Sequence, residues 1–115
     1  MKTLPLNTDF HVRGEKGWTF RIMERIGDVA LVRKTHAETT RTAWEVAIVQ
    51  RHDAYEIAGR KIEAGESLPP ATAFGTYAWA CAGENAAREK FAKVLHDVAL
   101  AEAKAKSQRS TGDNT

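Results

Sequence analysis

Four histidines and one cysteine are the side chains of this chain best suited to metal binding or nucleophilic catalysis. His11, His36, His52 and His96 lie far apart, without the close spacing that would place two imidazoles on one helix face. Cys81 has no adjacent lysine or arginine to lower the pKa of its thiol, and a single cysteine excludes both an internal disulfide and a thiolate cluster for zinc. We therefore expect no metal, no cofactor and no enzymatic activity.

Other catalytic arrangements are weaker still. Asp53 follows His52 and would orient an imidazole, and Ser67 would be a nucleophile, but neither lies in a nucleophile elbow or an active-cysteine motif. The glycines show neither the G-x-G-x-x-G nor the G-x-x-x-x-G-K spacing that cradles phosphate. They are typical of turns and bulges.

Five cations are candidates for contacting a phosphate backbone from an uncovered sheet face and the adjoining loop. They are Arg21, Arg33, Lys34, Arg41 and Arg51. Acidic residues are interspersed among them, so many of these cations will have a cross-strand partner. With a net charge of +2, the chain permits weak attraction to nucleic acid but does not require it, and it excludes an acidic mimic of DNA.

Length and composition indicate one small globular domain. The chain has 115 residues, enough for one core, and its 28% charged residues are nearly balanced in sign, as on an ordinary solvated surface. No secretion signal or membrane span is visible, and together with the cysteine usage this predicts a cytoplasmic protein.

Alternating apolar residues predict an antiparallel sheet. Trp18, Phe20 and Ile22 share one face of a strand, and Gly27-Asp28 is typical of a two-residue hairpin turn into a second strand, 29–33. Residues 44–49 alternate likewise and predict a central strand. We expect Trp18 and Trp44 at the centre of the sheet's covered face.

The remaining segments connect or flank these strands. Residues 1–16 are expected to be an irregular lead-in with a short edge segment, and 34–42 a mobile loop. Arg51 to Gly65 predicts a short edge strand interrupted at Gly59, and the two prolines after Leu68 require an extended crossover. Tyr77, Trp79 and Cys81 share a face and predict a last strand.

A single helix follows, from Glu84 to about Lys106. Its apolar stripe comprises Ala87, Phe91, Val94, Leu95 and Val98. The domain thus spans 1–106, and the polar residues 107–115 are expected to be a disordered tail. The alanine-rich end of the helix extends beyond what a short sheet covers, which makes a homodimer through this helix an alternative to a monomer.

Three segments together resemble small phage- or prophage-encoded proteins. They are Phe74-Gly75-x-Tyr77-Ala78-Trp79, Ala87-x-x-x-Phe91 and the strand Trp44 to Val49, within roughly residues 17 to 95. The resemblance implies a compact sheet, a proline-containing crossover and a closing helix, in a mobile-element setting. Most such proteins have no assigned activity, and many of this size occupy a surface on a host complex, including bacterial defence systems. No catalytic residue follows from the resemblance.

These observations predict an α+β fold with an antiparallel sheet of four or five strands, packed on one face by a long C-terminal helix. The leading hypothesis is a non-enzymatic binding module for a macromolecular protein partner, which binds or inhibits a host defence complex. The alternative is a nucleic-acid-binding protein that uses the five cations on an open sheet face. Neither hypothesis involves a membrane.

Overall fold

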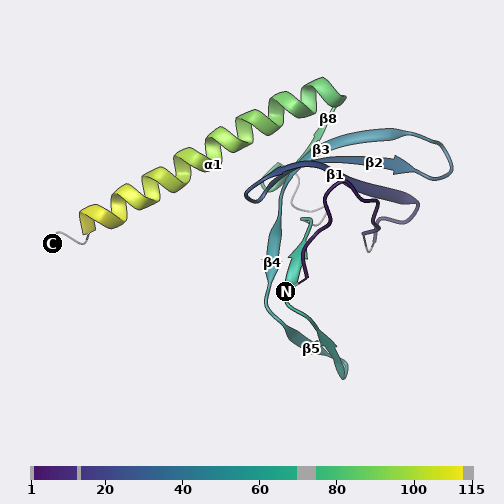
Figure 1. Cartoon of the computed structure of the whole chain (residues 1–115), viewed down its shortest axis with the longest axis horizontal. Coiled ribbons are helices and arrows are strands. Elements are labelled where there is room, and N and C mark those ends of the chain that lie inside the picture. Colours follow the sequence, from purple (N-terminus) through teal and green to yellow (C-terminus); the bar gives the residue numbers. More distant parts are fainter. Residues whose placement is uncertain (1, 13, 70–74, 113–115) are drawn as a thin grey trace.

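The computed structural model describes residues 2–12, 14–69 and 75–112, with side chains up to residue 107. It confirms the predicted α+β class. A four-stranded antiparallel sheet in the order β1-β2-β3-β8 consists of β1 (Trp18–Ile26), β2 (Val29–His36), β3 (Thr42–Ile48) and β8 (Ala78–Cys81). One helix, α1 (Glu84–Gly112), follows β8 and packs against this sheet (Figure 1).

The first hairpin forms as the alternation predicts. Ile26 pairs with Val29, and Gly27 between them has φ 59°, which glycine adopts without the steric penalty of a Cβ. β2 continues to His36, beyond the predicted strand end at Arg33, because Lys34 and Thr35 pair with both neighbouring strands. The loop between β2 and β3 is therefore shorter than predicted.

The helix covers one face of the sheet. Ala87, Phe91 and Val94 are buried against Val29, Leu31 and Val46, and Trp44 and Trp79 pack around this cluster. These contacts come from the first half of α1, where the apolar stripe lies. α1 continues past Lys106, where the sequence predicts its end, and Figure 1 shows its far half extending away from the sheet. Residues 107–112 are thus helical rather than irregular.

The other face of the sheet is covered as well, contrary to the expectation of an open face. Phe20, Ile22 and Val32 are at most 2% exposed there, and the partly buried residues packed against their cluster are Leu4, Phe10, Val12, Trp18 and Leu68. The lead-in is held by pairing of its backbone with β1: Phe10 and Phe20 exchange two hydrogen bonds, of 2.9 and 2.8 Å. Trp18 lies on this face and Trp44 under the helix, so the two tryptophans do not share a core.

The segment predicted as one short edge strand is two paired ribbons. β4 (Gln50–His52) pairs with β7 (Gly65–Ser67), and between them β5 (Tyr55–Ile57) pairs with β6 (Arg60–Ile62). Ala58 and Gly59 form the tip with φ of 50° and 77°, as in a type I′ turn. The β5–β6 hairpin projects away from the sheet and the helix (Figure 1).

Candidate functional site

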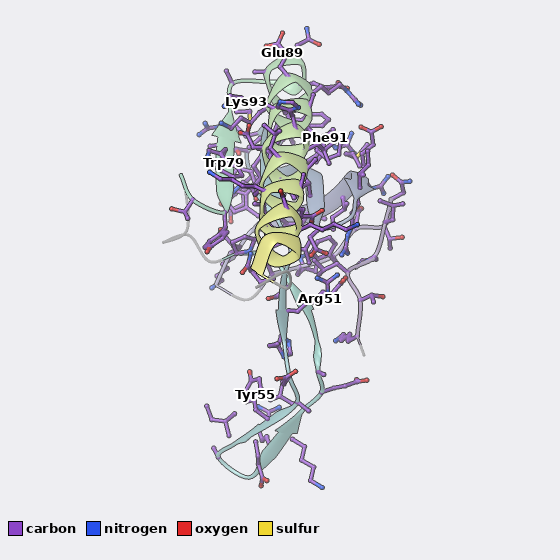
Figure 2. The ribbon with its side chains drawn as sticks, turned by 90° about the vertical axis from the view of Figure 1, so that its left-hand side faces the viewer. Arg51, Tyr55, Trp79, Glu89, Phe91 and Lys93 are labelled. Carbon is purple, nitrogen blue, oxygen red and sulfur yellow. The ribbon has the colours of Figure 1, made fainter. Side chains whose placement is uncertain are left out.

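The structure places the five predicted cations at different parts of the molecule. Arg51 lies near the base of the projecting hairpin (Figure 2), where its guanidinium contacts an oxygen of Asp28 at 2.6 Å and one of Glu66 at 3.6 Å. Arg41 is exposed in the loop between β2 and β3. Arg51 therefore lies apart from Arg21 and Arg33, whereas the carbonyl of Arg41 accepts a 2.9 Å hydrogen bond from the N–H of His36, next to Thr35.

Lys34 lies on the sheet face opposite the helix and is largely buried. Its Nζ is 3.7 Å from a carboxylate oxygen of Glu45 and lies over the rings of Trp18 and Phe20, at 5.0 and 5.5 Å from their centroids. Burial raises the pKa of Glu45, and the nearby Lys34 partly opposes this shift. Lys34 thus neutralises a buried carboxylate and is not presented to a ligand.

Arg21 and Arg33 are the two predicted cations that the fold brings together. They lie directly opposite each other on β1 and β2, on the side of the sheet that carries the helix, but beyond the residues that the helix covers. Thr19 and Thr35 form the next cross-strand pair. These four residues and Asp9 line a small pocket of about 280 Å³.

The projecting hairpin carries one exposed aromatic residue and one exposed aliphatic residue on the same strand. Tyr55 and Ile57 are 51% and 60% exposed, and their spacing places both on one side of β5. β5 and β6 pair only with each other among the described strands. An isolated two-stranded ribbon is only marginally stable in water. A partner surface that packs against this hairpin would therefore stabilise it.

Sequence reasoning missed this hairpin although a local signal was present. Tyr55-x-Ile57 and Lys61-Ile62 are short runs on either side of a turn that ends in Gly59. Such an arrangement is typical of a hairpin with a two-residue loop. In the sequence-based prediction, Gly59 instead interrupts one short edge strand.

Glu66 fixes the hairpin's base to the body of the domain. Its carboxylate accepts two hydrogen bonds of 2.7 Å from Arg25 and one of 3.1 Å from the backbone N–H of Leu4. The Arg25 guanidinium lowers the pKa of Glu66 to about 2. Asp28 joins the same network, and its pKa is lowered chiefly by the hydrogen bond from Arg51. The lead-in, the β1–β2 turn and the hairpin's base therefore meet at one carboxylate.

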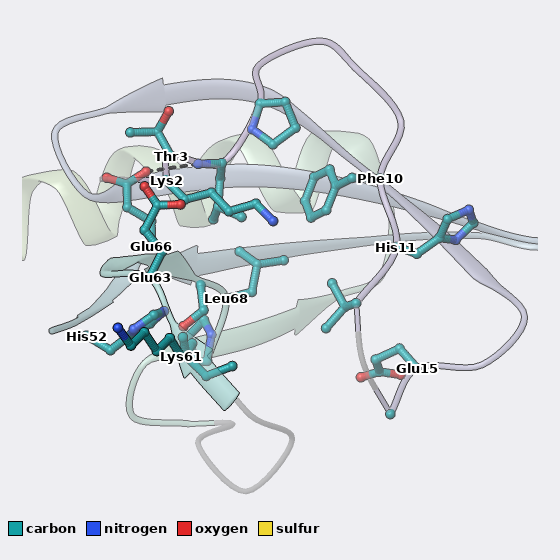
Figure 3. A pocket seen from close by; sticks show the side chains of 18 residues that line it. Lys2, Thr3, Phe10, His11, Glu15, His52, Lys61, Glu63, Glu66 and Leu68 are labelled. Carbon is teal, nitrogen blue, oxygen red and sulfur yellow. Dashed lines mark hydrogen bonds between the residues drawn. The ribbon is translucent and has the colours of Figure 1, made fainter. Parts of the chain in front are cut away.

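A groove of about 890 Å³ adjoins this base (Figure 3). The lead-in forms one wall through Leu4 and Phe10, and the segment around Leu68 forms another. Lys61 and Ile62 of β6 also line it, so the groove and the hairpin form one continuous surface. The groove offers apolar side chains with charged groups at its edge.

The groove's histidines are not arranged for acid–base catalysis. Figure 3 shows His11 and His52 at opposite ends. Within the described part of the chain, the Nδ1 atoms of His11 and His52 contact only backbone carbonyls, those of Trp18 at 3.4 Å and Asp53 at 3.2 Å. A catalytic imidazole is normally oriented by a carboxylate or hydrogen-bonded to a nucleophile, and neither is found at these two residues.

Two further features bear on the expected chemistry. The Cys81 thiol is partly buried, and burial raises its pKa, which makes it a poor nucleophile. The residues described contain no group of three or more His, Cys, Asp or Glu side chains placed to hold a metal ion.

No helix in the described ranges is long and apolar enough to cross a membrane. Phe74 of the aromatic segment lies outside the described residues.

Comparison with known proteins gives no assignment, since no family model, curated protein or solved structure matches this chain.

Proposed function

We propose that this protein is a non-enzymatic binding module that holds a protein partner through its β5–β6 hairpin and the adjoining groove. The observation that carries the proposal is the exposure of Tyr55 and Ile57 on a ribbon that projects from the domain. Tyrosine is enriched at the energetically dominant positions of protein interfaces, where apolar side chains enter a pocket of the partner.

The charge of the hairpin favours a protein over nucleic acid. From Tyr55 to Ile62 it has one acidic and two basic residues, and Glu56 lies directly opposite Lys61. A ribbon that follows a phosphate backbone needs several unpaired cations. This hairpin instead has apolar side chains and nearly balanced charges, as does a protein-binding surface.

The groove enlarges the surface beyond what six paired residues could supply. A specific protein interface buries about 800 Å² on each partner. The hairpin alone is too small for this, but it continues through Ile62 into the groove wall. A partner that contacts both would cover Tyr55 and Ile57 at one end and Phe10 and Leu68 at the other.

The resemblance to small phage-encoded proteins suggests where the partner is found. In that setting the module would occupy a surface of a bacterial host complex, such as a defence complex, and inhibit it by blocking that surface. The partner is accordingly sought in a bacterial lysate, in the cytoplasmic fraction.

The test uses a double variant, Tyr55→Ser with Ile57→Ser, and a control, Lys93→Gln, at an exposed position of α1 far from the hairpin (Figure 2). The wild type, the double variant and the control are each immobilised and exposed to the lysate. A protein that the wild type and the control retain is purified, and its affinity for the wild type, the double variant and the control is measured by calorimetric titration. We expect the double variant to lose tens of fold in affinity, as for hot-spot residues, while its unfolding free energy changes by less than about 0.5 kcal/mol. Equal affinity of all three would exclude the hairpin as the binding element.

Nucleic-acid binding is the alternative proposal, and the pair Arg21 and Arg33 favours it. Phosphate contacts make affinity fall steeply with salt, whereas an apolar protein interface does not. A gel-shift titration at two salt concentrations distinguishes these cases. If neither DNA nor RNA is retained at low salt, the alternative fails.

Self-association through α1 is a separate proposal. Residues 99–107 are all exposed, and Leu100 is 56% exposed. A second copy that packs along this half of the helix would cover these residues. Light scattering tests it, and a strictly monomeric species at high concentration would exclude it.

A further inference from the structure

Two arginines and two threonines form an array of two cross-strand pairs on the sheet just beyond the helix. Arg21 pairs with Arg33, and Thr19 pairs with Thr35, across β1 and β2. The alternation of β2 puts Arg33 and Thr35 on the same side as Val29 and Leu31, which the helix covers. The array is therefore the uncovered continuation of the helix-bearing face, and it lines a pocket of about 280 Å³.

The charges of this array are incompletely compensated. Like charges directly opposite each other in a sheet are destabilising. Asp9 accepts a 2.8 Å hydrogen bond from Nε of Arg21, but its own side chain is 60% exposed. Arg33 makes no ion pair or side-chain hydrogen bond with any described residue. The pocket thus has two guanidinium groups and a single carboxylate.

The hydroxyl groups of the array also have spare hydrogen-bonding capacity. In the part of the chain that the structure describes, the side chains of Thr19 and Thr35 make no hydrogen bond. Each hydroxyl can donate one bond, and each guanidinium presents several N–H groups in a planar fork. All four side chains line the same pocket, so these donors can act on one ligand.

The number and kind of these donors select the ligand. The planar fork of arginine matches two oxygens of a phosphate, and charge-assisted bonds of this kind are roughly twice as strong as neutral ones. The volume is below the roughly 300–1,000 Å³ of pockets that enclose drug-sized ligands, which suits a single small group. Arg21, Arg33 and Asp9 together carry one net positive charge, so the two negative charges of a phosphate dianion would neutralise it in full.

The geometry points to a binding site for a phosphate group, as the free ion or as a phosphate monoester, held by Arg21 and Arg33 with the Thr19 and Thr35 hydroxyls. The site is distinct from the hairpin and from the groove of Figure 3, because none of its lining residues is shared with that groove. It does not depend on the proposed protein partner.

The test is a calorimetric titration of the whole chain with inorganic phosphate at low ionic strength, with sodium chloride of equal ionic strength as the reference. We expect saturable phosphate binding at one site and none for chloride. Arg33→Gln should weaken it about tenfold or more, the loss of one charge-assisted interaction. Lys93→Gln, which removes an exposed cation of α1 outside the pocket, should bind as the wild type does.

Folding does not limit this test. Removing Arg33 relieves the repulsion from Arg21, so Arg33→Gln is expected to unfold at the same temperature as the wild type or a higher one. Thr35→Val is a second variant that keeps both charges and should weaken binding severalfold. Wild-type affinity in both variants, or a wild-type response to phosphate no larger than that to chloride, would overturn the site.

Two further titrations separate the sources of the phosphate. Phosphoserine tests a monoester on a small molecule, and an oligonucleotide with and without a 5′-phosphate tests a nucleic-acid end. Binding of either that is lost in Arg33→Gln identifies the source, while free phosphate alone would restrict the site to the ion. The Tyr55→Ser, Ile57→Ser variant should keep phosphate binding, so this site and the proposed function fail independently.

Discussion

Replacing Glu66 by glutamine should destabilise the domain in a pH-dependent way. The Glu66 carboxylate is only 5% exposed and accepts both bonds of the Arg25 guanidinium at 2.7 Å. Glutamine keeps the shape of the side chain but removes its charge. Arg25, itself 18% exposed, then loses its best partner and retains Asp28 at 3.2 Å.

The magnitude follows from the pKa of Glu66, which falls from an ordinary 4.5 to about 2. This difference corresponds to about 3 kcal/mol at neutral pH. Arg51, which adds to the shift, is 50% exposed and the network lies near solvent, so screening reduces the expected contribution to about 1–2 kcal/mol. The folded state holds the carboxylate ionised, so this stability is present above pH 4.5 and is lost as the pH falls towards 2.

The assay is urea unfolding followed by tryptophan fluorescence from pH 7 to pH 2.5. The wild type should exceed Glu66→Gln by about 1–2 kcal/mol at pH 7, and this difference should shrink steadily below pH 4.5. Glu89→Gln, at an exposed position of α1, should differ little from the wild type at any pH. A difference for Glu66→Gln that stays constant with pH, or is absent, would refute the role assigned to this ion pair.

Three other substitutions test the packing. Phe91→Ala should cost about 3–5 kcal/mol in thermal or urea unfolding, since its ring is 6% exposed beneath α1, and a loss below 1 kcal/mol would contradict the helix packing. Lys34→Met should lower the unfolding free energy by about 3 kcal/mol at pH 8, because it leaves the buried Glu45 carboxylate unpaired. The loss should be smaller at pH 4, where the raised pKa of Glu45 allows the carboxylate to take up a proton. Equal losses at pH 8 and pH 4 would argue against the ion pair. Gly17→Ala should cost about 1–2 kcal/mol, because φ is +85° and the new Cβ would lie 2.9 Å from Nε2 of His36; unchanged stability would show that this turn relaxes.

The parts of the fold that sequence predicts well are those governed by local periodicity. Trp18, Phe20 and Ile22 alternate, and they occupy one side of β1 as predicted. The stripe through Phe91 and Val94 faces the sheet, as its helical spacing requires. Each of these patterns is contained within a few turns or residues, so no knowledge of distant contacts is needed.

The cover of the second sheet face was not predictable in the same way. Leu4, Phe10 and Val12 follow no regular period, and what buries them is their contact with a strand that begins later in the chain. The five candidate cations do not form one surface for a related reason. The sequence identifies them as candidates, but the strand register decides that Arg21 lies opposite Arg33 and that Lys34 lies on the other face, near Glu45.

Covering both faces of the sheet determines how the remaining exposed surface can work. With the apolar residues of β1 to β3 used for two cores, the hairpin has no core of its own, and its position depends on the base where Glu66 binds Arg25. Tyr55 and Ile57 would therefore be presented to a partner only while that base is intact. It follows that Glu66→Gln should weaken the proposed partner's binding although Glu66 is buried away from Tyr55, and phosphate binding at Arg33 should be unaffected. Partner affinity that is indifferent to Glu66 would mean that the hairpin is positioned by the partner itself.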